Sequence, residues 1–129
     1  TLTGAIIVAL GEQNAGAFSN DDNICSDFLN SAKIESEGVW RMPLTESYDK
    51  LLESRVADMA NVGGRSASSI VAAKFLQRFV KDSIPWIHLD IAGVAFKKQG
   101  EDFGPKGATG WGVLTLNHFI ESNFEKQNN

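Results

Sequence analysis

The sequence has little cysteine, little proline and no long apolar run. Cys25 is the only cysteine among 129 residues, so no intrachain disulfide can form and a reducing, cytoplasmic compartment is expected. No stretch approaches the roughly 18 consecutive apolar residues of a membrane-spanning helix, so no membrane partner is expected. Lys and Arg total 12 against 16 Asp and Glu, a formal charge of −4. A negative surface argues against general nucleic-acid binding.

Apolar residues make up 43% of the chain and occur in short bursts between glycine and polar clusters. This fraction is too high for a disordered chain, and the length fits one ordinary domain. The first residue is Thr1 rather than Met, and no charged leader precedes the apolar run that follows. We therefore expect the chain to begin inside a longer protein.

Strand-like and helix-like segments alternate, which predicts an α/β layer architecture. The apolar run at 1–10 is typical of a strand covered on both faces, and a polar loop is expected over 11–20. Further extended segments are expected at 39–42 and 86–91. Helices are expected to begin at four places: 19–22, Thr45, 66–69 and about 113. The last helix is expected to turn four apolar side chains inward: Val113, Leu116, Phe119 and Ile120.

His88 and Asp90 are the most tempting pair for chemistry. The two-residue period of a strand puts both side chains on one face, where they could share a metal ion. A metal site needs three or four protein ligands, however, and the only other histidine is His118 on the last helix. The favoured interpretation is a structural histidine beside a carboxylate that caps nearby backbone groups.

Two glycines and Arg65 stand immediately before a predicted helix. Exposed amides and the helix dipole could cradle an anion there. The segment is not a Walker loop, because no Lys followed by Ser or Thr stands at the required spacing. The alternative, narrowly favoured, is a tight turn in which the glycines supply positive φ and Arg65 pairs with a carboxylate.

No nucleophile is evident. Cys25 lies on the inner side of a predicted helix without a local histidine, so a buried, inert thiol is expected. The serines at 66–69 lack the Gly-x-Ser-x-Gly pattern and are expected to cap the following helix. The residues by themselves provide no complete catalytic set.

Several segments together resemble the leucyl (cytosol) aminopeptidases. Five of them occur in the family's order: residues 1–5 (TLTGA), 39–44 (VWRMPL), 57–65 (ADMANVGGR), 86–93 (WIHLDIAG) and 107–110 (GATG). The resemblance implies the C-terminal portion of the catalytic domain over residues 1–129. It places the upstream metal-binding portion and the N-terminal domain outside the chain. The implied fold is part of a three-layer α-β-α sandwich with a mostly parallel or mixed central sheet.

The resemblance implies an exopeptidase that uses two divalent cations, Mn, Zn or Mg, to remove N-terminal residues, often leucine, from peptides. The family's metal ligands are carboxylates and one lysine that precede the segment matched by residues 1–5. Some of these ligands belong to an Asn-Thr-Asp-Ala-Glu-Gly-Arg signature, which this sequence lacks. The second lysine and the arginine of the family's active site are also absent from it. We therefore expect no catalytic side chain and no metal ligand in this chain.

The residues implied for substrate binding are mostly small. By similarity, the backbone of Leu2 and Gly4 binds the substrate main chain beyond the cleaved residue. Val62 matches a position beside the next residue's pocket. The pocket for the N-terminal side chain is lined by four residues: Thr1, Gly4, Ala92 and Ala95. Small apolar walls suit a side chain of the size of leucine or methionine.

Three departures from the family pattern stand out. Residues 66–69 are Ser-Ala-Ser-Ser where many members carry glycines, so the path of this loop is open. Ala95 replaces a larger residue of some relatives, which would widen the pocket. Trp111 stands where other residue types are common, and the sequence gives no account of it.

Two functions follow as hypotheses. The first is a fragment of an aminopeptidase that acts on peptide substrates. In this hypothesis the chain supplies pocket walls, and the rest of its own catalytic domain supplies the metals and the catalytic groups. The second is a non-catalytic binding or assembly module with the same scaffold. Family members form hexamers and some bacterial ones are described as DNA-binding, but the charge of −4 argues against DNA contact through this piece.

Overall fold

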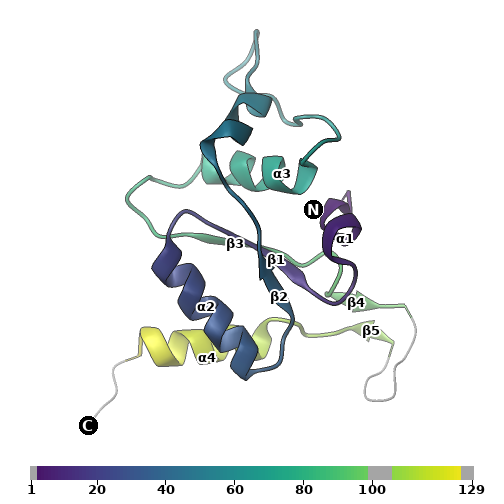
Figure 1. The fold of residues 1–129 in the computed structure, drawn as a ribbon, viewed down its shortest axis with the longest axis vertical. Helices are drawn as coiled ribbons and strands as arrows, with labels where there is room; N and C mark the ends of the chain where they lie inside the picture. The colour runs from purple at the N-terminus through teal and green to yellow at the C-terminus, as the bar shows by residue number, and fades with distance from the viewer. Residues whose placement is uncertain (1–2, 99–105, 126–129) are drawn as a thin grey trace.

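The computed structural model describes residues 3–98 and 106–125 (Figure 1). Within them, a three-stranded sheet has the order β2 (Val39–Arg41), β1 (Ala15–Ser19) and β3 (Ile87–Asp90). The central strand β1 pairs in parallel with β2 and antiparallel with β3. The sheet is therefore mixed, as the family resemblance implies. No helix in this part of the chain is long and apolar enough to cross a membrane.

Helices cover both faces of the sheet (Figure 1). The helices α1 (Ala5–Leu10) and α3 (Ser68–Gln77) lie on one side, and α2 (Asp22–Ile34) and α4 (Val113–Asn123) lie on the other. A 3₁₀ helix, η1 (Glu46–Leu52), packs on α3, and the short strands β4 (Phe96–Lys97) and β5 (Gly107–Ala108) form a separate antiparallel pair. The predicted α/β class with a three-layer arrangement is confirmed.

The prediction of a strand at 1–10 was wrong, because the apolar part of this run forms helix α1. Gly4, with φ 69° and ψ 19°, starts the helix in the left-handed region. Ile6 is fully buried, whereas Val8 is 91% exposed. An uninterrupted apolar run has no periodicity that distinguishes a strand from a short helix.

The loop expected at 11–20 contains the central strand β1, all five residues of which are buried. Its small side chains are required by the helix above it. A Cβ atom on Gly16 would lie 2.6 Å from the Cδ1 atom of Ile6 in α1. Phe18, two residues along on the same face, joins Ile6 and two α3 residues, Ile70 and Ala73, in the core cluster.

On the other face, α2 begins as the acidic start predicts. The Asp21 carboxylate accepts a hydrogen bond from the Ile24 N–H at 3.0 Å, a normal N-cap. Phe28 packs edge-to-face on Phe119 of α4, with 5.7 Å between ring centroids. Cys25 is fully buried beside them, and burial raises the pKa of its thiol above the ordinary value. The prediction of a buried thiol is confirmed.

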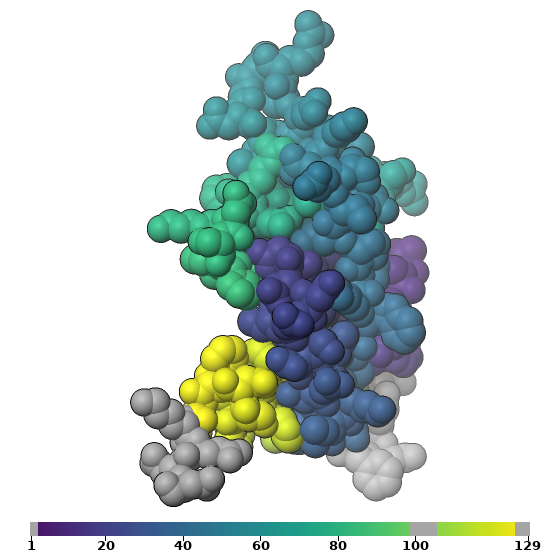
Figure 2. Space-filling view, turned by 60° about the vertical axis from the view of Figure 1, so that its left-hand side comes forward, coloured from purple at the N-terminus to yellow at the C-terminus, as the bar shows by residue number. Residues whose placement is uncertain are grey.

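The connection between η1 and α3 projects from the body of the molecule, at the top in Figures 1 and 2. Two of its apolar residues are strongly exposed: Val56 at 97% and Val62 at 80%. The connection returns to the body at Gly63, where a Cβ atom would lie 2.6 Å from the Cγ1 atom of Val71. Gly63 therefore allows the loop to lie close against α3.

Candidate functional site

A cleft of about 630 Å³ lies between α1 and the start of α3. Helix α1 contributes Ala5, Val8 and Ala9 to its walls, and Met42 lies beside them. Thr3, the 64–65 loop and the 67–70 segment complete its lining. We call this feature the α1–α3 cleft. Its walls are largely apolar and small, as expected of a pocket for a peptide side chain.

Left-handed residues shape both sides of the α1–α3 cleft. Gly4 turns the chain into α1, and Gly64 has φ 92° in the loop opposite. Ala67 has φ 52° immediately before α3. This conformation is strained for a residue with a Cβ atom. The path of the loop is thereby defined.

Arg65 is the one charged side chain among the described residues that line the α1–α3 cleft. The ion pairs within 3–98 and 106–125 join Arg41 to Asp22, Arg78 to Asp49 and His118 to Glu35. Of the two glycines expected to supply positive φ, only Gly64 does, and residues 62–64 form no regular turn. The carboxylate partner expected for Arg65 is not found in this part of the chain, so that part of the interpretation was wrong.

Among the predicted site residues that the structure describes, only Gly4 is flanked by residues of the α1–α3 cleft. Gly4 borders the α1–α3 cleft, because its neighbours Thr3 and Ala5 both line it. Val62 is 80% exposed and precedes Gly64 by two residues, but it is not among the described residues that line the cleft, so its place beside the substrate stays a prediction. Thr1 and Leu2 lie outside the described residues.

The other two predicted site residues lie elsewhere. Ala92 is half-buried and packs against the core cluster beneath α1. Ala95 is half-buried, and its carbonyl accepts a hydrogen bond from the Thr109 N–H at 3.0 Å. Neither is among the described residues that line the α1–α3 cleft. Their assignment to the pocket for the N-terminal side chain stays a prediction.

Trp111 lies in a smaller cavity of about 330 Å³, together with Gly93, Val94 and Phe96. Gly93 is buried against the loop after α1, where a Cβ atom would lie 2.3 Å from the Gly11 carbonyl oxygen. Trp111, for which the sequence gives no account, therefore lies beside the point where the backbone of Gly93 touches that of Gly11.

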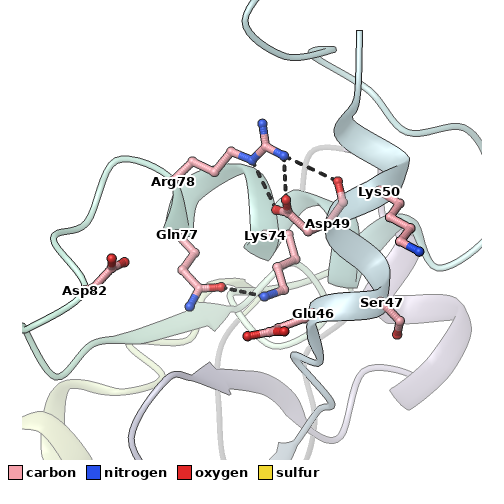
Figure 3. Close-up of a pocket in the computed structure, with 8 residues that line it drawn as sticks. All are labelled: Glu46, Ser47, Asp49, Lys50, Lys74, Gln77, Arg78 and Asp82. Carbon is pink, nitrogen blue, oxygen red and sulfur yellow. Dashed lines mark hydrogen bonds and ion pairs between the residues drawn. The ribbon is translucent and has the colours of Figure 1, made fainter.

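A larger cavity of about 720 Å³ separates η1 from α3 (Figure 3). Two of its charged groups, Arg78 and Asp49, pair with each other. The Arg78 guanidinium donates to both carboxylate oxygens of Asp49, at 3.1 and 2.6 Å, and this hydrogen bonding lowers the pKa of Asp49. Lys74, only 7% exposed, donates to the Gln77 side chain at 3.0 Å. The Arg78–Asp49 pair fastens η1 to α3. The α1–α3 cleft is the better candidate site because it is lined by segments that the family resemblance links to the substrate.

His88 and Asp90 behave as structural residues. The His88 ring stacks between Phe18 and Trp86, at centroid distances of 5.7 and 6.0 Å, and burial lowers the pKa of the imidazole. Asp90 is 1% exposed and accepts a hydrogen bond from the Ala92 N–H at 3.3 Å. These contacts agree with the favoured interpretation of the pair.

The described part of the chain does not fit a metal centre. No three His, Cys, Asp or Glu side chains within 3–98 and 106–125 are grouped closely enough to hold a metal ion. The two cations implied by the family resemblance therefore have no site among these residues. The absence of ligands from the whole chain stays a prediction.

Met42 and Ser69 line the α1–α3 cleft, although sequence analysis did not assign them to a site. Met42 lies in the 39–44 motif block, which is the signal that could have found it. Ser69 was interpreted as a helix cap, yet the first turn of α3 receives no side-chain cap from its N-cap residue, Ala67.

Comparisons with known proteins agree with the motif blocks. The family model described as "Cytosol aminopeptidase family, catalytic domain" matches residues 1–117. The probable cytosol aminopeptidase of Cereibacter sphaeroides is 61% identical over 126 residues, which are 98% of this chain and 26% of that protein. The corresponding protein of Dinoroseobacter shibae is 58% identical over 125 residues. The chain spans about a quarter of the length of these curated relatives.

Solved structures give the same result. A tomato leucine aminopeptidase mutant superposes with a TM-score of 0.87 at 41% identity, covering 93% of this chain and 23% of that one. The bottromycin maturation enzyme BotP, in complex with Mn, has a TM-score of 0.86 at 36% identity, covering 92% and 26%. The motif order, the fold and the family match agree, and the chain belongs to the cytosol aminopeptidase family.

Proposed function

We propose that this chain is the C-terminal portion of the catalytic domain of a complete cytosol aminopeptidase, which hydrolyses N-terminal, leucine-type residues from peptides. The observation that carries the proposal is the α1–α3 cleft. Gly4 and the 62–65 loop are distant in sequence, and the family resemblance links both segments to the substrate. Thr3 and Ala5, which flank Gly4, and Gly64 and Arg65 of the loop all line this cleft.

In this proposal the chain binds and orients the substrate. The backbone of Leu2 and Gly4 would hold the peptide main chain, and Val62 would lie beside the residue after the cleaved bond. The N-terminal side chain would contact Thr1, Gly4, Ala92 and Ala95. Two divalent cations (Mn, Zn or Mg), held by the rest of the protein, would supply the activated water. Small apolar walls exclude bulk water from the substrate.

Contact with the rest of the same catalytic domain is supported by apolar side chains that face outward. Val8 of α1 is 91% exposed, and Val113 and Leu114 of α4 are 65% and 58% exposed. Contiguous apolar patches mark interaction surfaces, and Val113 and Leu114 are neighbours at the start of α4. A cytoplasmic location and assembly into a hexamer are further parts of the proposal, and both rest on the family resemblance.

A non-catalytic binding or assembly module is the second candidate. It rests on an observation that it shares with the first candidate: the described residues contain no group of three or more His, Cys, Asp or Glu side chains that could hold a metal ion. Such a module would keep the α1–α3 cleft for peptide binding and would lack turnover in every form of the protein.

The test is hydrolysis of leucine p-nitroanilide by the complete protein. We expect turnover with added Mn²⁺, loss of turnover in excess chelator and recovery when Mn²⁺ is restored. The second candidate instead predicts peptide binding, measured by calorimetry, without turnover under any metal condition.

A further inference from the structure

We propose that Arg65, Ser69 and the start of α3 form a subsite for the C-terminal carboxylate of short peptide substrates. This inference rests on the proposed function and deepens it, because it makes the enzyme favour substrates whose free carboxylate lies one or two residues beyond the cleaved bond. Three observations in the α1–α3 cleft support it.

The first observation is the charge of the α1–α3 cleft. Arg65 is the one charged side chain among its described lining residues, and it is absent from the ion pairs within 3–98 and 106–125. A guanidinium presents paired N–H donors whose geometry matches a carboxylate. Arg65 is exposed and forms no ion pair with the described residues, so its guanidinium is available to an anionic ligand. The cleft is therefore electrostatically suited to one anionic group.

The second observation is the start of α3. This helix has ten residues, and its N-cap residue, Ala67, makes no side-chain cap hydrogen bond. The first N–H groups of a helix have no partner within the helix, and the dipole places partial positive charge on them. Ser68, Ser69 and Ile70 carry these groups, and all three residues line the α1–α3 cleft.

The third observation is independent of the helix end. Ser69 is only 6% exposed, yet among the residues that the structure describes its hydroxyl has no hydrogen-bond partner. The hydroxyl oxygen keeps some contact with solvent, because it is not one of the fully buried, unpartnered atoms among the described residues. Ser69 also lines the α1–α3 cleft, so its hydroxyl is available to a ligand bound there. It can donate a hydrogen bond to a carboxylate oxygen in place of water.

The position of these groups selects the carboxylate end of the peptide. Arg65 follows Val62 by three residues, and Val62 matches the pocket of the residue after the cleaved bond. Gly4, on the opposite wall, matches the position that binds the main chain beyond that bond. In the proposed pose, the C-terminal side of the peptide lies near Arg65. An amidated end carries no charge and gains no ion pair there.

The experiment compares kcat/KM for Leu-Gly and Leu-Gly-amide in the complete protein. We expect the wild type to favour the free acid. Arg65→Gln should reduce the acid-to-amide ratio about tenfold, chiefly through KM for the acid, as expected for one lost charge-assisted contact. Arg65→Lys should restore part of the ratio, and Ser69→Ala should reduce it by a smaller factor. Arg55→Gln, an exposed arginine of the projecting connection, is the matched control and should leave the ratio unchanged.

The outcomes separate this inference from the proposed function. Absence of wild-type turnover on Leu-Gly-amide and leucine p-nitroanilide alike would refute the proposed function, and the subsite with it. Turnover with an acid-to-amide ratio that Arg65→Gln leaves unchanged overturns the subsite alone. Equal losses on the acid and the amide also overturn it, since they indicate a general structural role for Arg65.

Discussion

One carboxylate oxygen of Glu37, Oε2, accepts two hydrogen bonds from Thr115. The backbone N–H of Thr115 donates one at 3.0 Å, and the Thr115 hydroxyl donates the other at 2.5 Å. The other carboxylate oxygen accepts from the Gly112 N–H at 2.8 Å. Gly112 is the N-cap of α4 and has no side chain to cap the helix. A residue from the loop after α2 therefore caps α4 from a distance, and a negative charge at this end also suits the helix dipole.

Glu37→Gln should lower the free energy of unfolding by about 1–2 kcal/mol, because the amide loses the charge and one of the two acceptor oxygens. Urea unfolding followed by circular dichroism measures the change. Glu121→Gln, an exposed residue on α4, is the matched control and should have an effect below about 0.5 kcal/mol. Equal effects of the two substitutions would contradict the capping role of Glu37.

Ala67→Gly should stabilise the protein by about 0.5–1 kcal/mol, because Ala67 has φ 52° and glycine adopts this conformation without strain. The matched control, Ala72→Gly, lies inside α3 and should destabilise the protein by about 1 kcal/mol. Thermal unfolding of both variants checks the opposite signs. A lower melting temperature for Ala67→Gly would count against the strained loop.

Gly4→Ala should lower kcat/KM for leucine substrates more than its effect on stability explains. Gly4 has φ 69°, so any side chain strains the backbone there, but the added Cβ atom would lie no closer than 3.6 Å to a described residue. Gly110, with φ 71° and open space around its Cβ position, supplies the matched control. Both variants should lose about 1 kcal/mol of stability.

Only Gly4→Ala should impair turnover, since only Gly4 borders the α1–α3 cleft. Parallel unfolding and steady-state kinetics on the complete protein separate the two effects. Unchanged kcat/KM in Gly4→Ala would remove Gly4 from the site.

Stability should fall as the pH drops below about 6.5, because burial lowers the pKa of His88 in the folded state. The unfolded chain then binds a proton that the folded chain does not, so the free energy of unfolding decreases on acidification. His88→Phe keeps an aromatic ring between Phe18 and Trp86 and should flatten this loss between pH 7 and pH 5. In His118→Gln the loss should persist. If the free energy of unfolding of His88→Phe falls with pH as steeply as that of the wild type, His88 is not the group responsible.

Elements with local signals were predictable from the sequence. The N-cap of α2 depends on the Asp21 side chain and its own following turn, and the alternation at 86–91 matches β3. The central strand β1 was missed because its small residues fit helices on both faces, a requirement that arises only in the tertiary structure. Gly16 under Ile6 is the clearest case.

The inward face of α4 illustrates the same limit. Val113 was expected inside but is 65% exposed, whereas Thr115 is fully buried. A threonine can occupy the interior here because Glu37 satisfies its hydroxyl, and a contact across 78 residues leaves no local pattern. Phe119, one turn later on the same face, is buried as expected.

The candidate site was predictable only in part. Family motifs identified Gly4 and the loop that contains Arg65, and the structure brings these segments to one cleft. The free Ser69 hydroxyl could not be inferred, since serines before a helix usually cap it. Here a left-handed Ala67 occupies the N-cap position instead.

The central claim is that this chain supplies peptide-binding walls and not the metal chemistry. Leucinamide hydrolysis in saturating Mn²⁺, measured for the isolated 129-residue chain beside the complete protein, tests it most directly. We expect turnover by the complete protein and none by the isolated chain. Turnover by the isolated chain would contradict the account and return His88 and Asp90 to consideration as metal ligands.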